Sequence, residues 1–221
     1  MKSQFPQDKL ERLSKGGAVA VLILDKLESA VPLAKAIWAG GINAMELTLR
    51  TPVALEALKA IRAEVPEMLA GVGTILTPEQ VKAVYAAGAD FGVAPGLNES
   101  VVKTAQDVGL PFAPGVMTPS EIEKGVVLGC RELKLFPAEL SGGVKYMKSV
   151  AAPYEHLGLR YMPLGGLTID TLGAYFATGL TLAVGGSWIA PRATIQEENW
   201  AKITENARKT REAIDQARAA Q

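Results

Sequence analysis

Strand-like apolar runs alternate with helix-like segments along the whole 221-residue chain. Alternating strands and helices build βαβ units, which place the strands parallel to one another in a sheet. Eight runs follow one another at a spacing of roughly 20 to 28 residues, which suits consecutive βαβ crossovers. They are Ala18–Leu24, Ala44–Leu49, Leu69–Val72, Phe91–Ala94, Phe112–Gly115, Glu132–Phe136, Arg160–Leu164 and Leu182–Gly185. This order predicts an α/β protein, a (β/α)8 TIM barrel in which residues 1–221 form a single domain.

Local signals mark the ends of the helices between these strands. Thr77-Pro78-Glu79-Gln80 and Thr118-Pro119-Ser120-Glu121 each combine a capping threonine, a first-turn proline and an acceptor side chain three residues on. An extra amino-terminal helix is expected at Pro6–Lys15 and a long charged helix at Glu197–Arg218. Glycines that can close helices in the left-handed conformation stand at Gly40-Gly41, Gly88, Gly109, Gly129 and Gly179.

A doubly wound open sheet is the main alternative fold. It normally carries a G-x-G-x-x-G turn after its first strand, where this chain has Leu24-Asp25-Lys26-Leu27. The barrel is therefore the better prediction.

Composition narrows the expected partners. Lys plus Arg and Asp plus Glu each total 23, so no net charge attracts nucleic acid or a membrane surface. The single cysteine, Cys130, cannot form an internal disulfide, which fits a reducing compartment. The longest apolar run, Ala18–Leu24, is too short to span a bilayer. We expect a cytoplasmic protein that binds small molecules.

Two charged residues of the second strand share one face. Successive strand side chains point to opposite faces, so Glu46 and Arg50 are expected to point into the barrel, near the strand ends that carry barrel active sites. One interpretation is a buried ion pair between them, although such pairs are often poor stabilisers. The other is that Glu46 transfers protons and Arg50 binds a substrate carboxylate through its planar guanidinium.

Lys134 occupies the same kind of position on the sixth strand, between outward-pointing Leu133 and Leu135. A buried, deprotonated lysine can attack a ketone and form a Schiff base. The alternative is a surface lysine whose stem lies along apolar residues. The interleaved leucines favour burial, so Lys134 and Glu46 are expected to share one lumen.

Glycine pairs end the last two strands, at Gly165-Gly166 and at Gly185-Gly186, with Ser187 next. Glycines let backbone N–H groups approach an anion closely, and barrels commonly bind phosphate in the loops after strands seven and eight. Tight turns without a ligand are the alternative. Thr74 offers a hydroxyl toward the lumen after the third strand, whereas Ser141-Gly142-Gly143 can equally be a plain turn.

Other reactive residues favour structural roles. The only histidine, His156, precedes the seventh strand and should lie on the face opposite the expected site. Cys130 fits as small core filler, Ser100-Val101-Val102-Lys103 as a helix face, and Trp188 as packing between the last loop and helix. No cluster of histidine, cysteine or carboxylate has metal-ligand spacing, so no metal is expected.

Six short motifs occur in a specific order along the chain. They are Glu46-Leu47-Thr48-Leu49-Arg50-Thr51, Gly71-Val72-Gly73-Thr74, Ala94-Pro95-Gly96, Pro114-Gly115-Val116, Lys134-Leu135-Phe136-Pro137-Ala138-Glu139 and Gly185-Gly186-Ser187-Trp188. As an ordered set they resemble the 2-keto-3-deoxy-6-phosphogluconate (KDPG) aldolase family, from about Leu10 to Arg208.

The resemblance implies a class I aldolase of the Entner–Doudoroff pathway, which cleaves KDPG to pyruvate and glyceraldehyde 3-phosphate without a metal or other cofactor. Lys134 would form the Schiff base, and Glu46 would be the general acid and base. Arg50 and Thr74 would hold the pyruvate carboxylate.

The resemblance also implies the remaining contacts to substrate. The two glycine pairs and Ser187 fall where the family binds phosphate, Phe136 would shape an apolar wall, and Pro95 belongs to the same substrate-binding set. Related enzymes are commonly trimers, so a homotrimer is expected.

Leu164 departs from the resemblance, because the family usually has threonine at this point of the seventh strand. The natural aldehyde and its stereochemistry therefore stay open, and 2-keto-4-hydroxyglutarate (KHG), cleaved to pyruvate and glyoxylate, is a second candidate substrate. The alternatives are an aldolase for a related 2-keto-3-deoxy sugar acid, a phosphosugar epimerase and a non-catalytic phosphosugar-binding barrel.

Overall fold

The computed structural model describes residues 3–220. In chain order its elements are α1 (Gln7–Gly16), β1 (Ala18–Leu22), the 3-10 helix η1 (Leu27–Ser29), α2 (Ala30–Ala39), β2 (Ala44–Thr48), α3 (Ala54–Glu64), β3 (Leu69–Gly73), α4 (Pro78–Ala86), β4 (Gly92–Val93), α5 (Glu99–Val108), β5 (Phe112–Ala113), β6 (Gly115–Val116), α6 (Pro119–Val127), β7 (Glu132–Leu135), α7 (Gly143–Ala151), the 3-10 helix η2 (Ala152–Leu157), β8 (Arg160–Pro163), α8 (Leu172–Phe176), β9 (Val184–Gly186), α9 (Arg192–Gln196) and α10 (Trp200–Ala219). Strands and helices therefore alternate, as the sequence predicted.

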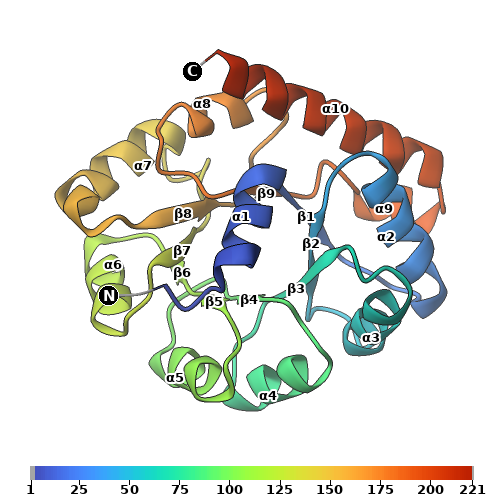
Figure 1. Ribbon diagram of the computed structural model, residues 1–221, viewed down its shortest axis with the longest axis horizontal. Helices are drawn as coiled ribbons and strands as arrows, with labels where there is room; N and C mark the ends of the chain where they lie inside the picture. Colours follow the sequence, from blue (N-terminus) through green and yellow to red (C-terminus); the bar gives the residue numbers. More distant parts are fainter. Residues whose placement is uncertain (1–2, 221) are drawn as a thin grey trace.

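The strands are parallel and curl around the middle of the molecule, with α1 across one end and the other helices outside the strands (Figure 1). One sheet has the strand order β5-β4-β3-β2-β1-β9, and the other has the order β6-β7-β8. Isolated parallel bridges pair Tyr161 with Thr181 and Leu164 with Gly185 between the two sheets. The architecture is thus an α/β fold built on a curled parallel sheet.

The predicted fifth strand, Phe112–Gly115, is wrong as a single strand, because it divides at Pro114 into β5 and β6. Proline has no N–H to donate to a ladder. On either side of it the chain pairs with a different neighbour: β5 pairs with β4, and β6 pairs with β7. The Pro114 carbonyl still accepts a hydrogen bond of 2.9 Å from the Lys134 N–H. The break therefore lies beside the strand that carries the lysine.

The predicted helix signals are confirmed. Thr77 and Thr118 each form a complete capping box, with Gln80 and Glu121 respectively. Five of the predicted closing glycines are left-handed: Gly41, Gly88, Gly109, Gly129 and Gly179. The long charged helix begins slightly later than predicted, because Asn199 caps it by accepting a hydrogen bond from the Lys202 N–H. Within residues 3–220, no helix has the length and apolar content needed to cross a bilayer.

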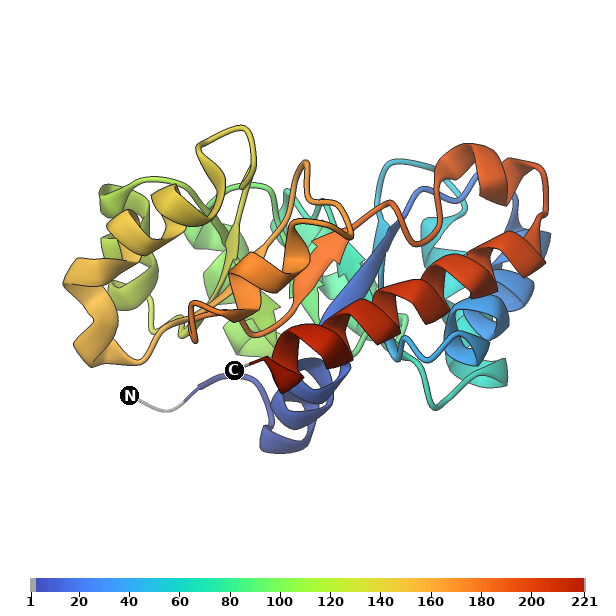
Figure 2. The ribbon, with the colours of Figure 1, turned by 90° about the horizontal axis from the view of Figure 1, so that it is seen from above.

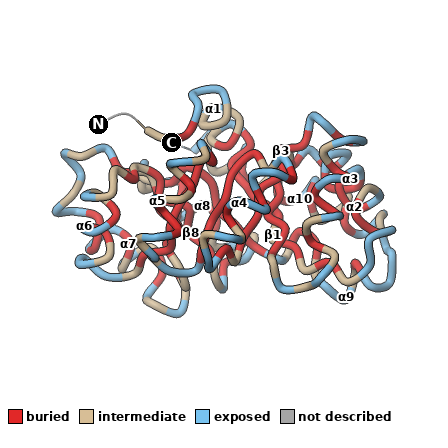
Figure 3. Tube along the Cα trace, turned by 90° about the horizontal axis from the view of Figure 1, so that it is seen from below, coloured by how far each residue is buried: buried red, intermediate tan, exposed pale blue. Residues whose placement is uncertain are grey.

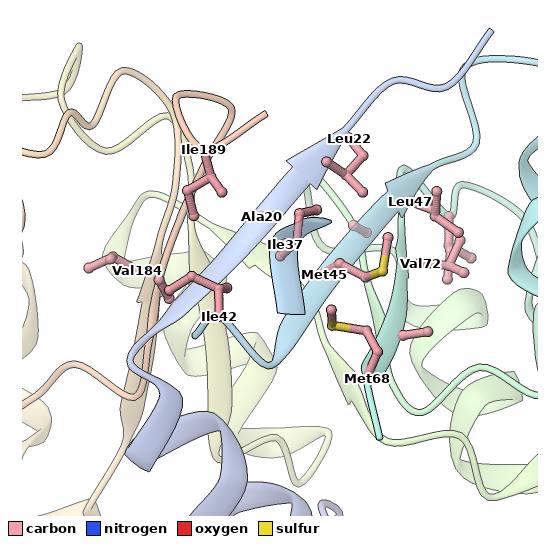
Figure 4. Close-up of a cluster of buried hydrophobic side chains, with 14 of the residues drawn as sticks. Ala20, Leu22, Ile37, Ile42, Met45, Leu47, Met68, Val72, Val184 and Ile189 are labelled. Carbon is pink, nitrogen blue, oxygen red and sulfur yellow. The ribbon is translucent and has the colours of Figure 1, made fainter. Parts of the chain in front are cut away.

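Two layers of apolar side chains lie on opposite faces of the strands, and the chain is most deeply buried between them (Figure 3). The outer layer joins Met45 and Leu47 of β2 to Ile37 of α2 (Figure 4). The inner layer includes Ala44 of β2 and Leu13 of α1. Alternate residues of β2 therefore belong to different layers, as the parity argument requires.

Helix α1 closes the amino-terminal end of the strands, and the carboxyl-terminal end of α10 lies beside it (Figure 2). The Arg211 Nη1 donates to the carbonyls of Lys15 and Gly16, at 3.2 and 2.7 Å, and the Arg218 Nη1 donates to the Lys15 carbonyl at 2.7 Å. The last carbonyls of a helix have no partner within the helix. The two arginines supply these partners and tie the last helix to the first.

We expect Arg211→Ala to lower the free energy of unfolding by about 2 kcal/mol, because the hydrogen bonds from its guanidinium to two carbonyls at the end of α1 are lost. Urea unfolding followed by circular dichroism measures this change. Arg208→Ala is the matched control, since Arg208 pairs only with Glu212 on the exposed face of the same helix. Equal destabilisation by the two variants would show that α10 is not held through Arg211.

Candidate active site

A cavity of about 300 Å³ opens at the carboxyl ends of the strands. It is lined by every residue that the sequence assigned to the site: Glu46, Arg50, Thr74, Pro95, Lys134, Phe136, Gly165, Gly166, Gly185, Gly186 and Ser187. These residues come from β2, β7 and β9 and from the segments that follow β2, β3, β4, β7, β8 and β9. The fold thus brings the whole predicted set into one cavity, while the role of each residue stays a prediction.

Lys134 and Glu46 meet inside this cavity. The Lys134 Nζ lies 3.1 Å from Oε1 and 3.4 Å from Oε2 of Glu46, and the two side chains are only 6% and 1% exposed. β7 and β2 present these groups across the lumen, as the parity of both strands predicted. An unpaired charge would be costly at this depth, so each group stabilises the other. The contact also places a proton acceptor within hydrogen-bond reach of an amine.

Arg50 lies at the exposed end of the same cavity. The predicted alternative of an ion pair between Glu46 and Arg50 is wrong, because the carboxylate of Glu46 pairs with Lys134 instead. Arg50 follows the last residue of β2, where the chain leaves the strand and carries the guanidinium toward solvent. Among residues 3–220, no carboxylate forms an ion pair with Arg50. Its planar donor group can therefore bind an incoming anion.

Thr74 has an unusual backbone conformation, with a φ of 61° in the left-handed region. For a β-branched residue this conformation is strained, at a cost of about 1 to 3 kcal/mol. Such strain persists where the surrounding structure fixes the backbone, and it gathers at functional sites. Here it directs the segment after β3 along the cavity wall.

Apolar side chains complete the walls, and some of them escaped the sequence analysis. The Phe136 ring centre lies 5.5 Å from the Lys134 Nζ, a distance that suits a cation–π contact. Thr48 lines the cavity, as its shared parity with Glu46 predicts, and so does Val21, which parity along the first strand would have found. The Thr48 hydroxyl donates to the Leu22 carbonyl at 2.9 Å, so its bond is internal to the fold. Ile23 has the same parity as Val21 within the predicted strand Ala18–Leu24, whereas Leu167 lies in the segment after β8, where no period marks it.

The Gly165-Gly166 turn is fixed from behind by the segment after β7. Both glycines are left-handed, with φ of 94° and 86°. The N–H groups of Ala138 and Glu139 donate to the carbonyls of Leu164 and Gly165, at 2.7 and 3.0 Å. The Tyr175 hydroxyl donates to the Glu139 carboxylate at 2.7 Å, and burial together with this bond raises the Tyr175 pKa. The lysine strand and the glycine turn therefore form one connected unit.

The residues given structural interpretations lie outside the cavity lining. His156 is exposed on η2, and Ser100 and Lys103 lie on α5. Cys130 is buried, which raises the pKa of its thiol to about 11. The Trp188 indole donates to Thr210 of α10 at 3.0 Å, which confirms its predicted packing.

Ser141-Gly142-Gly143 is a turn that leads into α7, where the Ser141 hydroxyl donates to the Pro137 carbonyl at 2.7 Å. Across residues 3–220, no three histidine, cysteine or carboxylate side chains are grouped as metal ligands.

Comparison with known proteins identifies the family. The sequence model described as "Aldolase: KDPG and KHG aldolase" matches residues 10–206. The chain belongs to the KDPG and KHG aldolase family. It is 43% identical over 196 residues to a 2-dehydro-3-deoxy-phosphogluconate aldolase of Dickeya dadantii, covering 89% of this chain and 91% of the relative. It is 41% identical over 206 residues to a KHG/KDPG aldolase of Escherichia coli, covering 93% and 94% of the two chains.

Solved structures of this aldolase family have the same fold. The KDPG aldolase of Legionella pneumophila, with pyruvate captured at low pH as a covalent carbinolamine, superposes with a TM-score of 0.86 at 35% identity over 91% of this chain and 97% of its own. The Zymomonas mobilis aldolase with 3-phosphoglycerate gives 0.84 at 37% identity over 92% and 93%. The protein is thus an aldolase, a carbon–carbon lyase, and the alternative of a non-catalytic binding protein is set aside.

A second lumenal carboxylate, Glu132, lies two residues before Lys134 on β7 and is 4% exposed. Burial raises its pKa, although the Ser3 hydroxyl donates to it at 2.8 Å. A carboxyl with a raised pKa binds more protons in the folded state than in the unfolded state. Stability is therefore lost as the pH rises from the unfolded pKa through the folded one.

Glu132→Gln removes this ionisation and keeps an acceptor for Ser3. We expect the variant to gain stability over the wild type between about pH 4 and pH 7, with the smallest difference at the acid end. Thermal unfolding across this range measures the difference. A difference that is constant with pH would show that the pKa of Glu132 is the same in the folded and unfolded states.

Proposed function

We propose that this protein is a class I aldolase that cleaves KDPG to pyruvate and glyceraldehyde 3-phosphate through an imine on Lys134. The observation that carries the proposal is the 3.1 Å contact between Lys134 and Glu46 inside a cavity that has Arg50 at its mouth. The names of the relatives and the covalent pyruvate adduct of the Legionella enzyme support the same chemistry.

In the proposed reaction, the Lys134 Nζ adds to the C2 carbonyl of the ketoacid, and loss of water gives a protonated imine. Glu46 removes the proton of the C4 hydroxyl, the C3–C4 bond breaks, and its electron pair moves into the imine to give an enamine. The aldehyde leaves. Glu46 then returns its proton to C3, and hydrolysis of the imine by water releases pyruvate and restores the amine.

The proposed substrate contacts use residues that line the cavity. Arg50 and Thr74 would bind the carboxylate, and the Gly165-Gly166 and Gly185-Gly186 segments with Ser187 would bind the phosphate. Pro95 and Phe136 would contact the carbon chain between them. The 3-phosphoglycerate in the Zymomonas structure carries both a phosphate and a carboxylate, which supports this pairing of subsites.

KHG is a second proposed substrate. The name of the Escherichia coli relative supports it. Leu164, only 3% exposed, presents an apolar wall to the cavity where the resemblance led us to expect a hydroxyl. A ketoacid with fewer hydroxyl groups loses less at such a wall.

We further infer that the two sheets act as one closed (β/α)8 barrel in a single domain, with Pro114 as a local break. The Leu164–Gly185 bridge supports closure on the other side. A homotrimer in the cytoplasm is the expected state of the enzyme by its resemblance to the family.

Reductive trapping of pyruvate tests whether Lys134 forms the imine. Pyruvate with borohydride should give a stable adduct on the peptide that contains Lys134, because borohydride reduces the imine. Mass spectrometry of the digested protein locates it. Lys134→Arg is the control: it keeps a cation beside Glu46 but cannot form an imine. An adduct that persists in Lys134→Arg, or none in the wild type while another class I aldolase is trapped, would reject the proposal.

Substrate preference tests the phosphate subsite. Ser187→Ala should lower kcat/KM for KDPG about 10-fold, since a hydrogen bond to a charged phosphate is lost. The same variant should change kcat/KM for KHG much less, because KHG has no phosphate. Coupled assays of both substrates measure the ratio. Equal losses on the two substrates would place Ser187 outside the phosphate subsite.

A further inference from the structure

Strand β3 contributes little side-chain volume to the lumen. Its inward positions are Leu69, Gly71 and Gly73, because Leu69 belongs to the inner layer while Ala70 and Val72 belong to the outer one. Only Leu69, at the amino-terminal end, has a side chain. The carboxyl-terminal half of this strand therefore leaves two empty positions beside the cavity.

Side chains of the neighbouring strands fill both positions. A Cβ on Gly71 would overlap the ring of Phe91, which belongs to the floor of the lumen. A Cβ on Gly73 would overlap the Oε1 of Glu46 and lie 2.5 Å from its Cδ and 2.8 Å from its Cγ. The Glu46 carboxylate thus occupies the space that any other residue at position 73 would take.

We propose that Gly73 is a positioning residue for the aldol reaction: its missing side chain lets the Glu46 carboxylate lie against Lys134. The proposal rests on the proposed role of Glu46. β2 and β3 pair Thr48 with Gly73, so the two backbones are fixed and a methyl group at position 73 cannot move away. The carboxylate is the part that shifts, toward the open cavity and away from the amine.

The backbone itself accepts alanine at this position. Gly73 is not among the left-handed glycines, so a Cβ adds no conformational strain. The expected effect is therefore local. Misplacing a proton-transfer group by about 1 Å can lower a rate about 100-fold. Imine formation at Lys134 and binding at Arg50 need no such placement, so kcat should fall while the KM for the ketoacid changes little.

The test uses exchange of the pyruvate methyl protons with deuterated water, which reports proton transfer at C3 whatever the natural aldehyde is. Gly73→Ala should slow this exchange about 100-fold while pyruvate is still trapped on Lys134 by borohydride. The control is Gly96→Ala, in the loop after β4, where a Cβ meets nothing within 4 Å. It should exchange at the wild-type rate.

A double-variant cycle separates positioning from a general structural effect. In a Glu46→Gln background, Gly73→Ala should add little further loss, because both changes remove the same proton transfer. A full, multiplicative loss would overturn the proposal, as would normal exchange by Gly73→Ala. If Gly73→Ala lowers the free energy of unfolding, it should lower it less in a Glu46→Ala background, where the overlapping carboxylate is gone, and an equal loss in both backgrounds would also overturn the proposal.

Assays of the wild type distinguish failure of the proposed aldolase function from failure of the proposed role of Gly73. Pyruvate exchange without cleavage of KDPG would reject the proposed substrate and leave the role of Gly73 testable by the same assay. Absence of both trapping and exchange in the wild type would reject the imine mechanism and, with it, the role of Gly73.

Discussion

The contact between Lys134 and Glu46 is the interaction on which the site depends. Two opposite charges that are 6% and 1% exposed persist only if each compensates the other, because desolvation of an unpaired ion costs several kcal/mol. The contact requires β7 and β2 to face each other across a lumen, with inward parity on both strands and their carboxyl ends at one level. The curled sheet supplies all three conditions. A flat sheet would leave the same residues on separate strands with no common cavity.

Small and large inward positions alternate around that lumen, and this alternation shapes the site. Each empty position is filled from elsewhere: Phe91 fills the space at Gly71, Glu46 that at Gly73, and Leu164 that at Gly185. A barrel interior has room for only some of its inward side chains, so neighbouring strands must share the volume. In this chain the space left free beside Gly73 holds the Glu46 carboxylate. A glycine on an inward position, such as Gly73, therefore helps to determine where the Glu46 carboxylate lies.

Most of the fold and of the candidate site could be predicted from the sequence. The same physical reasons explain which predictions were wrong or missing. Period-2 alternation placed Glu46 and Lys134 on lumenal faces, and the Gly165-Gly166 pair placed the turn after β8, because these signals depend on neighbouring residues alone. The second pair, Gly185-Gly186, lies within β9 and forms no turn. The partner of Glu46 could not be predicted, since Arg50 and Lys134 shared the same parity and only the depth of each along its strand decides between them. The division at Pro114 was missed because a run of apolar residues does not reveal a change of pairing partner. Leu167 was missed because loops have no period.

The two ends of the lumen differ in what they contribute: one end stabilises the fold, and the other holds the candidate active site. At the amino-terminal end, Leu13 and the floor residues are close-packed, and arginines of α10 satisfy the last carbonyls of α1, so this end can contribute stability. At the other end the chain accepts a strained Thr74 and a buried charge pair, both of which cost free energy. Because both ends belong to the same strands, a well-packed floor can hold a costly site in place. It follows that changes in the floor affect catalysis only through the depth at which β2 and β7 present their two charged side chains.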